Sequence, residues 1–305
     1  MNPANLLKGI LFSNVFYGIC AVALSVETAF QQQIPLASPL FYLVISGITI
    51  VYYTHAYRNL YLAVHESANE RTWWYYRNRK ILPLTQVILS ATVLCATTLL
   101  VLQYAADLRR ISIASWLVLC AFALLTALYY GIELPGKGLL SLRSIGLIKP
   151  FLIGMIWAGT VSVLPVFFHD VIHHTTLLFS TTTLFLLIKN WLFISILCIL
   201  FDIKDYAEDH NLQLKTFVVR FGLRKTLFEI ILPMAVASWC CIILVVIAGN
   251  YPVARILINA IPFLLLITVC YSMYQRKTIL YYLAIIDGLM LVKAACGIIG
   301  MVVLK

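Results

Sequence analysis

The chain has 305 residues, of which 62% are hydrophobic and only 11% are charged, and its mean hydropathy is +0.96. Soluble domains carry about 25% charged residues, so this composition excludes a soluble globular protein and predicts an integral membrane protein. The net charge of +10 does not point to nucleic acid as a partner, because the basic residues form neither a block nor a stripe.

Nine apolar runs follow one another along the chain, and each has about the 20 residues that a helix needs to cross a bilayer. They cover residues 8–30, 38–58, 81–105, 112–131, 146–168, 177–201, 226–249, 252–273 and 279–304. The first run is too long for the apolar part of a signal peptide. The pattern predicts an all-α polytopic membrane protein of about nine transmembrane helices, with residues 1–305 forming a single domain.

The basic residues predict an orientation, because cytoplasmic loops of membrane proteins are enriched in Lys and Arg. With the N-terminus inside, most of them fall on the cytoplasmic side: Lys8, Arg58, Arg71, Arg77, Arg79, Lys80, Lys137, Arg143, Lys149, Lys204, Lys215, Arg220, Arg224, Lys225, Arg276 and Lys277. The outside receives Arg109, Arg110, Arg255 and Lys305. We therefore expect a multi-pass protein of an inner or plasma membrane, with a cytoplasmic N-terminus.

The cytoplasmic connections 59–80, 132–145 and 202–225 are long and polar, whereas most outer connections are short. Since binding and catalytic residues concentrate on such loops, we expect the functional site on the cytoplasmic side. The outer segment 169–176 holds His169, His173 and His174. No further His or Cys on that side would complete a metal-ligand set.

The segment FDIKDYAEDH, residues 201–210, follows the sixth apolar run and concentrates acidic residues. On a helix continuing from that run, Asp202, Asp205 and Asp209 would share one face, where like charges are unfavourable unless a cation lies between them. Mg²⁺ binds carboxylates and completes its shell from water and substrate phosphates. The spacing therefore favours Mg²⁺ and a phosphate ligand. A solvated segment leaving the membrane is the alternative.

Charged residues also occur inside the predicted spans, where they are rare and face protein or a water-filled cavity. Lys189 and Asn190 lie in the sixth run, and Asp287 and Lys293 lie in the ninth. They are either functional residues or a paired interior, for instance Lys189 with Asp287. Glu27 is expected to reach the membrane interface as an anchor.

The segment DIKDYAEDH, followed by KTFVVRFG, resembles the second Asp-rich motif of the UbiA superfamily of intramembrane prenyltransferases. This resemblance implies nine helices around a central cavity, with Mg²⁺ holding a prenyl diphosphate. It further implies that Asp202, Asp205 and Asp209 are catalytic metal ligands and that Lys215 contacts the diphosphate. Residues 128–159 resemble the connection between the fourth and fifth helices, where Arg143, and less closely Lys137 or Lys149, would bind the diphosphate.

The first Asp-rich motif of the family, N-D-x-x-D-x-x-x-D, is not kept. Asn59 matches its Asn, but Leu60, Ala63 and Ser67 stand at its Asp positions. The flanking Arg71-Thr72 and Asn78-Arg79 still resemble the family, so the resemblance implies Asn59 and Arg71 as substrate-binding residues.

Three readings of the missing acids remain open. In the first, His65, Glu66 or Glu70 replaces the missing acids. In the second, one Mg²⁺ suffices and arginines neutralise the phosphates directly, namely Arg58, Arg71, Arg77 and Arg79. In the third, catalysis has been lost and only binding or assembly remains.

The expected function is Mg²⁺-dependent transfer of a prenyl group from an isoprenoid diphosphate to a lipophilic acceptor within the membrane. Aromatic residues that would stabilise an allylic cation are Tyr17, Tyr53, Tyr129, Tyr130, Trp157 and Trp191. The alternatives are an intramembrane terpene cyclase, suggested by Asn59 and Ala63, and a non-catalytic isoprenoid-phosphate binding or assembly protein. A transporter would rest only on Lys189, Asp287 and Lys293.

Overall fold

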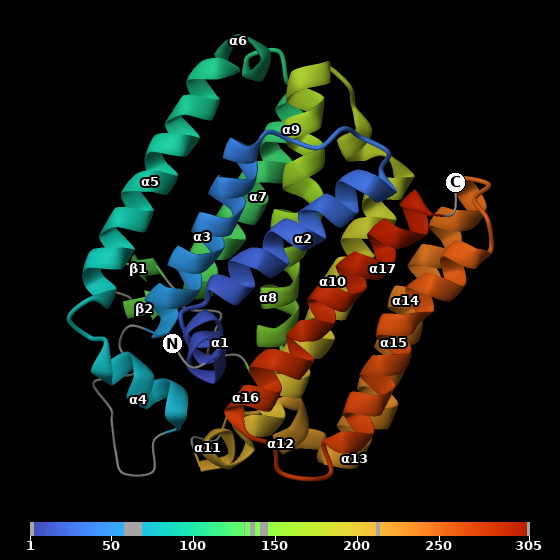
Figure 1. The fold of residues 1–305 in the computed structure, drawn as a ribbon. Helices are drawn as coiled ribbons and strands as arrows, with labels where there is room; N and C mark the ends of the chain where they lie inside the picture. Colours follow the sequence, from blue (N-terminus) through green and yellow to red (C-terminus); the bar gives the residue numbers. More distant parts are fainter. Residues whose placement is uncertain are drawn as a thin grey trace.

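The computed structural model describes residues 3–57, 69–130, 132–134, 138–140, 146–211 and 214–303, with backbone alone at residues 3–4, 130, 132–134, 138–140 and 207–209. Within these ranges the protein is a bundle of long helices (Figure 1). The all-α prediction is therefore confirmed.

Among the described residues, seven helical segments are long and apolar enough to cross a membrane. Four are single helices: α3 (Pro39–Tyr57), α5 (Leu82–Gln103), α10 (Thr181–Lys204) and α15 (Ala254–Ser272). Three contain a π-helical turn: α8 (Lys149–Ala158) with η3 (Gly159–Val163) and α9 (Leu164–His173); α13 (Leu223–Lys225) with η5 (Thr226–Ile231) and α14 (Leu232–Ala248); and α16 (Ile279–Tyr281) with η6 (Tyr282–Ile286) and α17 (Gly288–Val302). The shorter apolar helix α7 (Ile113–Tyr130) corresponds to the fourth predicted span.

The first predicted span is broken rather than continuous. Helices α1 (Pro3–Phe12) and α2 (Val15–Gln31) meet at an angle of 69°. Asn14 at the break has φ 66°, a left-handed conformation that Asn tolerates better than most residues. Its buried side chain donates to Thr54 Oγ1 and to the Tyr75 hydroxyl and accepts from Arg71, so tertiary contacts stabilise the break.

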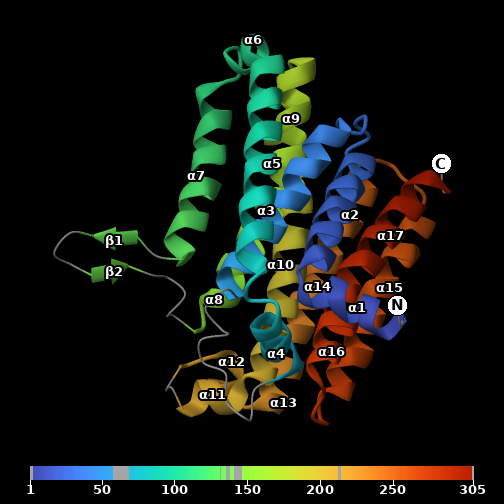
Figure 2. The ribbon, with the colours of Figure 1, turned by 60° about the vertical axis from the view of Figure 1, so that its left-hand side comes forward.

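Short helices cover one end of the bundle, where α4 (Glu70–Arg77), α11 (Tyr206–Asn211), α12 (Phe217–Phe221) and α13 gather (Figures 1 and 2). At the opposite end lies α6 (Ala105–Leu108), and η4 (Leu177–Phe179) is a short 3-10 turn. Strands β1 (Ile132–Leu134) and β2 (Gly138–Leu140) form a small antiparallel hairpin, with Glu133 opposite Leu139. The apolar pattern did not predict this hairpin, because each strand is only three residues long.

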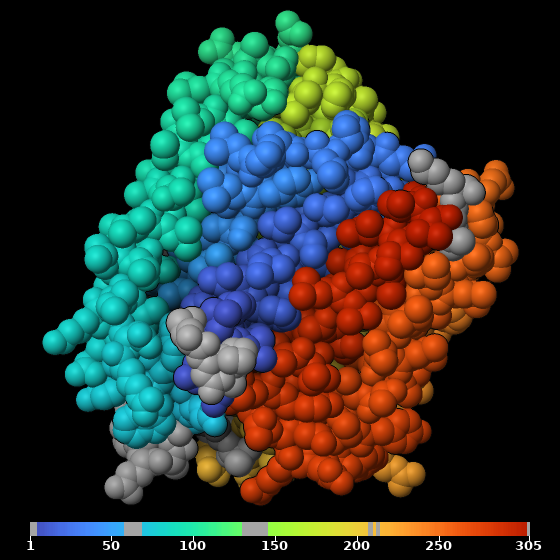
Figure 3. All heavy atoms as spheres, viewed as in Figure 1, coloured from blue at the N-terminus to red at the C-terminus, as the bar shows by residue number. Residues whose placement is uncertain are grey.

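The long helices pack into a ring. Helix α2 lies between α3 and α17, and α10 lies between α8 and α14, while α15 packs against α14 and α17. Figure 3 shows α2, α17 and α15 side by side on one closed face. Only 11% of the apolar window of α5 is buried, so most of this helix is expected to face lipid.

A buried charged network joins three of these helices at depth. The Nζ atoms of Lys189 and Lys293 lie 2.7 Å from the two carboxylate oxygens of Glu27, and Glu27 has 0% exposure. Lys189 also donates to Gln31, and Lys293 donates to Asn190. The expectations that Glu27 is an interfacial anchor and that Lys189 pairs with Asp287 are therefore wrong. Helix α2 turns Glu27 inward, where burial of the two ammonium groups requires a counter-charge.

Candidate functional site

A cavity of about 470 Å³ lies among α2, α3, α4, α8, α10 and α17. Polar residues at one part of its wall are Asn69, Arg71, Thr72, Lys149, Asp202, Lys204, Asp205 and Thr216. Aromatic and aliphatic residues line the remainder, including Tyr17, Tyr53, Tyr57, Tyr129, Trp157, Ile194, Leu197, Phe201 and Met290. Because charged groups and apolar surface line the same cavity, the cavity suits an amphiphilic molecule.

Asp202 and Asp205 both line the cavity at the end of α10. Asp202 is 2% exposed and lies 3.0 Å from Lys149 Nζ, while Asp205 lies 2.9 Å from Lys204 Nζ. Helix α10 ends at Lys204, and Asp209 belongs to the separate helix α11. The prediction of one continuous acidic helix is therefore wrong, consistent with the repulsion expected between carboxylates on one helical face. The side chain of Asp209 lies outside the described residues.

Close packing of α8 on α10 places Lys149 beside Asp202. A Cβ at Gly154 would lie 2.2 Å from Ser195 Oγ and 2.8 Å from the Trp191 carbonyl oxygen, so only glycine permits this approach. Trp191 Nε1 in turn donates to the Phe151 carbonyl at 2.9 Å. Small residues at helix contacts are typical of membrane bundles.

Arg71 is held rigidly at the cavity wall. Its side chain is buried with 3% exposure, donates to Asn14 Oδ1, and lies 3.8 Å over the Tyr57 ring. Burial by itself lowers the pKa of the guanidinium, but the surrounding groups, led by the Tyr57 phenol, raise that pKa above its ordinary value. Arg71 is therefore a fixed positive charge.

Two buried polar atoms of the cavity-lining residues make no hydrogen bond within the described part of the chain. They are Arg71 Nε and Thr216 Oγ1. Buried polar atoms are normally satisfied by protein, water or ligand. Both atoms are consistent with a polar ligand in this end of the cavity.

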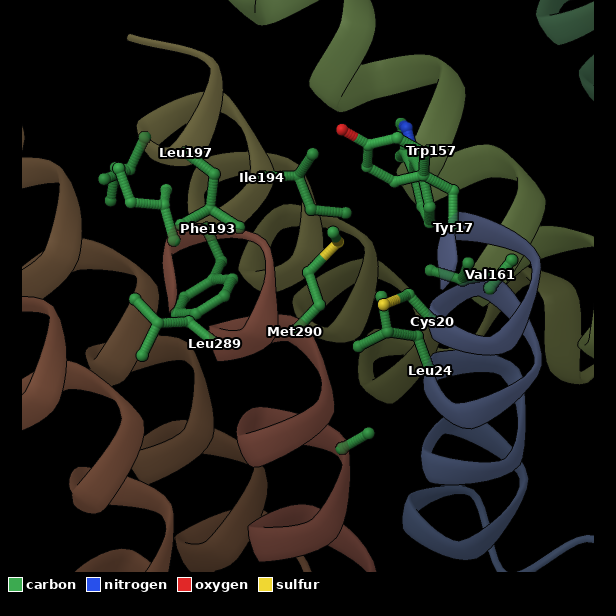
Figure 4. Close-up of a cluster of buried hydrophobic side chains, with 14 of the residues drawn as sticks. Tyr17, Cys20, Leu24, Trp157, Val161, Phe193, Ile194, Leu197, Leu289 and Met290 are labelled. Carbon is green, nitrogen blue, oxygen red and sulfur yellow. The ribbon is translucent and has the colours of Figure 1, made fainter. Parts of the chain in front are cut away.

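Aromatic side chains form the deeper wall. The rings of Tyr17 and Tyr53 stack with centroids 4.3 Å apart, and Trp157 Nε1 donates to the Tyr53 hydroxyl at 2.7 Å. Figure 4 shows Tyr17 and Trp157 on one side, with Ile194 and Met290 between them and Phe193. Of the other predicted aromatics, Tyr129 lines the cavity, Trp191 binds Phe151 instead, and the side chain of Tyr130 lies outside the described residues.

Asp287 also lines the cavity, although the sequence suggested only an intramembrane pair. It is 4% exposed, and the Tyr17 hydroxyl donates to its Oδ2 at 2.7 Å. The signal in the sequence was an acid within an apolar run. Its position beside Tyr17 depends on packing between the first and last spans, which no local pattern reveals.

Several predicted site residues do not meet at the cavity. Lys215 is exposed and is not among the lining residues. Glu70 pairs instead with Lys8 at 2.8 Å, so it does not replace the missing acids, and the exposed Arg77 and Arg79 are not lining residues. The remaining predicted residues lie outside the described part of the chain, namely Arg58, Asn59, His65, Glu66, Lys137 and Arg143. Sequence reasoning missed Lys204 and Thr216.

No group of three metal-ligating side chains is present among the described residues. The histidines of the outer segment belong to these residues, so they do not form such a group. The His169 and His173 rings lie 4.4 Å apart. Asp170 accepts from the backbone of Leu177 and Leu178, so this region stabilises a turn. Two carboxylates lie at the polar part of the cavity, and Mg²⁺ commonly uses one or two carboxylates together with substrate phosphates. The donor set at Asp202 and Asp205 therefore fits Mg²⁺ shared with a phosphate ligand.

Comparisons with known proteins identify the fold. No protein-family model matches the chain, and no curated protein matches it. A solved structure of a digeranylgeranylglyceryl phosphate synthase of membranes is similar, with a TM-score of 0.55 over 97% of this chain and 98% of that chain, at 15% sequence identity. At this identity the likeness shows a shared fold, that of an integral multi-pass membrane protein.

Proposed function

We propose that this protein is an intramembrane prenyltransferase of the UbiA type. It would transfer a prenyl group from an isoprenoid diphosphate to a lipophilic acceptor. The observation that carries the proposal is the single cavity with two carboxylates and three cationic side chains at its polar part and an aromatic wall beyond. The fold shared with a digeranylgeranylglyceryl phosphate synthase supports it.

The diphosphate would bind at the polar part of the cavity. Arg71, Lys149 and Lys204 supply positive charge there, and charge-assisted hydrogen bonds to phosphate are among the stronger ones available. Arg71 is already fixed by Asn14 and Tyr57, so it would lose little conformational freedom on binding. The cavity volume of about 470 Å³ lies within the usual range for small-molecule sites.

Asp202 and Asp205, with Asp209 from α11, would hold Mg²⁺ against the diphosphate. The ion would act as a Lewis acid that neutralises charge on the departing pyrophosphate. Lys149 and Lys204 orient the two described carboxylates through ion pairs. These lysines would contact phosphate oxygens as the leaving group gains charge.

The hydrocarbon chain would extend along the aromatic and aliphatic wall. The faces of Tyr17, Tyr53 and Trp157 would stabilise the allylic cation, since aromatic faces attract cations. Ile194, Leu197 and Met290 would exclude water, which prevents hydrolysis of that cation. The cavity mouth, beside the short helices α4, α11 and α12, would open to the cytoplasm, as the basic loops predict.

The test is Mg²⁺-dependent release of pyrophosphate by the purified protein from radiolabelled geranyl, farnesyl and geranylgeranyl diphosphate in lipid nanodiscs. The double variant Asp202→Ala, Asp205→Ala should lose activity by at least ~100-fold, because the leaving group would lose its electrostatic stabilisation. The matched control is Asp107→Asn, at the far end beside His174, which should leave the rate unchanged.

Failure of wild-type protein to release pyrophosphate from any chain length would reject the enzymatic proposal. Binding of prenyl diphosphate without turnover would instead identify a binding or assembly protein. A cyclic hydrocarbon formed without an acceptor would identify a terpene cyclase.

A further inference from the structure

We infer that Asp287 is the general base of the reaction and that the acceptor is a lipophilic molecule carrying a hydroxyl group, bound by Asp287 beside Tyr17. This inference rests on the proposed prenyl transfer and names its acceptor chemistry. It is carried by the position of a nearly buried carboxylate in the wall of the cavity.

The local backbone directs Asp287 toward the cavity. The preceding turn, Tyr282–Ile286, is π-helical, and the Asp287 amide donates to the Tyr282 carbonyl five residues earlier at 3.1 Å. A π-turn inserts one extra residue into a helix and is frequent at functional sites. It changes the direction in which the following side chains leave the axis, and Asp287 is the first residue after it.

One oxygen of Asp287 is held, and the other is available. Tyr17 donates to Oδ2 at 2.7 Å, whereas Oδ1 has no hydrogen bond from any side chain in the part of the chain that the structure describes. The carboxylate of a residue with only 4% exposure would normally be paired. An oxygen that opens into a cavity without a protein donor is suited to accept a donor from a ligand.

Asp287 forms no direct ion pair among the described residues, although Arg71 and Lys204 act on it electrostatically. Lys189 and Lys293, the cations of the neighbouring spans, are both held by Glu27. Lys149 and Lys204 form ion pairs with Asp202 and Asp205. Arg71 is fixed by Asn14. Lys189, Lys293, Lys149 and Lys204 thus pair with other carboxylates, so a direct ion pair does not account for the position of Asp287.

The depth of Asp287 indicates where the acceptor lies. It is eight residues beyond Ile279, the first residue of α16, which corresponds to roughly 12 Å along a helix. Tyr17, Trp157, Ile194 and Met290 share this part of the wall. The acceptor therefore needs a donor group on an otherwise apolar body, which describes a lipid alcohol or an alkylated phenol.

The chemical step balances with these groups. The acceptor oxygen donates an electron pair to C1 of the prenyl group, and a new C–O bond forms. The C1–O bond to the diphosphate breaks, and its electron pair leaves with pyrophosphate. The hydroxyl proton moves to Oδ1 of Asp287, while Tyr17 stabilises the carboxylate before the transfer.

The test uses wild-type protein in nanodiscs with two hydroxyl probes, 4-dodecylphenol and 1-dodecanol, and their methyl ethers. Tritiated geranylgeranyl diphosphate reports donor binding, and tritiated probes report acceptor binding. We expect at least one hydroxyl probe to bind at least ~10-fold more tightly than its ether, because the ether cannot donate a hydrogen bond. The phenol and alcohol arms distinguish the two sources of the hydroxyl.

Asp287→Asn should reduce kcat for transfer to the hydroxyl probe by ~100-fold or more, the usual contribution of a general base. The KM for that probe and the retention of geranylgeranyl diphosphate should change by less than ~3-fold, because the amide oxygen still accepts a hydrogen bond. Asp287→Ala should also abolish the preference for hydroxyl over ether. Asp107→Asn is the matched control, and the melting temperature of each variant reports folding.

The assignment would be overturned if wild type bound the hydroxyl probes and the ethers equally, or if Asp287→Asn kept the wild-type kcat. In either case, pyrophosphate release by wild type would leave the proposed function in place. If wild type neither binds nor cleaves geranyl, farnesyl or geranylgeranyl diphosphate, the proposed function fails, and the assignment of Asp287 fails with it. Loss of donor binding in a well-folded Asp287→Asn variant would show a role at the diphosphate and would also overturn the assignment.

Discussion

Asn14 links three parts of the protein through one side chain. Its amide contacts Thr54 on α3 and both Arg71 and Tyr75 on α4, and its left-handed backbone makes the turn between α1 and α2. The same residue therefore bends the first span and fixes the guanidinium at the cavity wall. We regard Asn14 as a positioning residue for Arg71.

Asn14→Gly should separate these two roles, because glycine adopts positive φ without strain but has no amide. We expect a loss of about 1–3 kcal/mol in the free energy of unfolding, since buried partners lose hydrogen bonds. Affinity for geranylgeranyl diphosphate should also fall, as Arg71 becomes less well fixed. Thermal unfolding and radioligand binding in nanodiscs measure the two effects.

Asn250→Gly is the control for that substitution. Asn250 is exposed and also has a positive φ, of 51°. Asn250→Gly therefore makes the same substitution at the same kind of backbone position, away from the cavity. Equal effects of the two substitutions on diphosphate affinity would contradict a role for Asn14 in placing Arg71.

Sequence reasoning was effective for residue type and weak for partners. It singled out Arg71, Asp202 and Asp205, all of which line the cavity. It placed Glu27 at the interface because an acid near the end of an apolar run often reaches water. The structure instead buries Glu27 between two lysines that lie 162 and 266 residues away. Such pairing depends on how distant helices pack, so the pattern of neighbouring residues in the sequence does not reveal it.

Among the elements, the contact between α8 and α10 determines the polar part of the cavity. Gly154 allows the two helices to touch at Ser195, and the same helices carry Lys149 and Asp202. A change in their separation is therefore expected to change the ion pair between those residues.

Gly154→Ala should destabilise the protein by about 1–3 kcal/mol, the usual cost of overpacking. Pyrophosphate release should decrease with it, because α8 would carry Lys149 away from Asp202. Gly9→Ala is the matched control, since nothing lies within 4 Å of a Cβ built there. The idea would be refuted by a Gly154→Ala protein with wild-type melting temperature and wild-type turnover.

The elements themselves were largely predictable, because a span must have the length of the bilayer and few charges. The run predicted at 81–105 corresponds to Leu82–Gln103, and that at 252–273 to Ala254–Ser272. The break at Asn14 escaped prediction because neither Gly nor Pro stands at residues 13–14, where the apolar run is interrupted. The end of α10 at Lys204 escaped it as well, because the acids permitted either a continuous helix or a turn.

At the scale of the whole molecule, the network of Glu27, Lys189 and Lys293 connects α2, α10 and α17. One carboxylate faces two ammonium groups, and Asn190 and Gln31 supply further acceptors. A buried ion pair contributes little net stability when intact, but removal of one partner is strongly destabilising.

Glu27→Gln should therefore lower the free energy of unfolding by about 3–5 kcal/mol, because both lysines lose their counter-charge. The triple variant Glu27→Gln, Lys189→Met, Lys293→Met should recover most of that loss, since no buried charge remains. Thermal unfolding in detergent, followed by circular dichroism, measures both. A triple variant no more stable than Glu27→Gln would show that the network is required for more than charge balance.

The same network sets an order for biosynthesis. Glu27 enters the membrane with the first span, while Lys293 is made 266 residues later. A nascent chain thus carries an unmatched carboxylate until Lys189 is made 162 residues after Glu27, at a cost of a few kcal/mol for each exposed charge in a span. The final helix closes the ring and brings Lys293 to the second oxygen of Glu27, so a protein shortened at its C-terminus is left with an unfinished interior that cellular quality control can recognise.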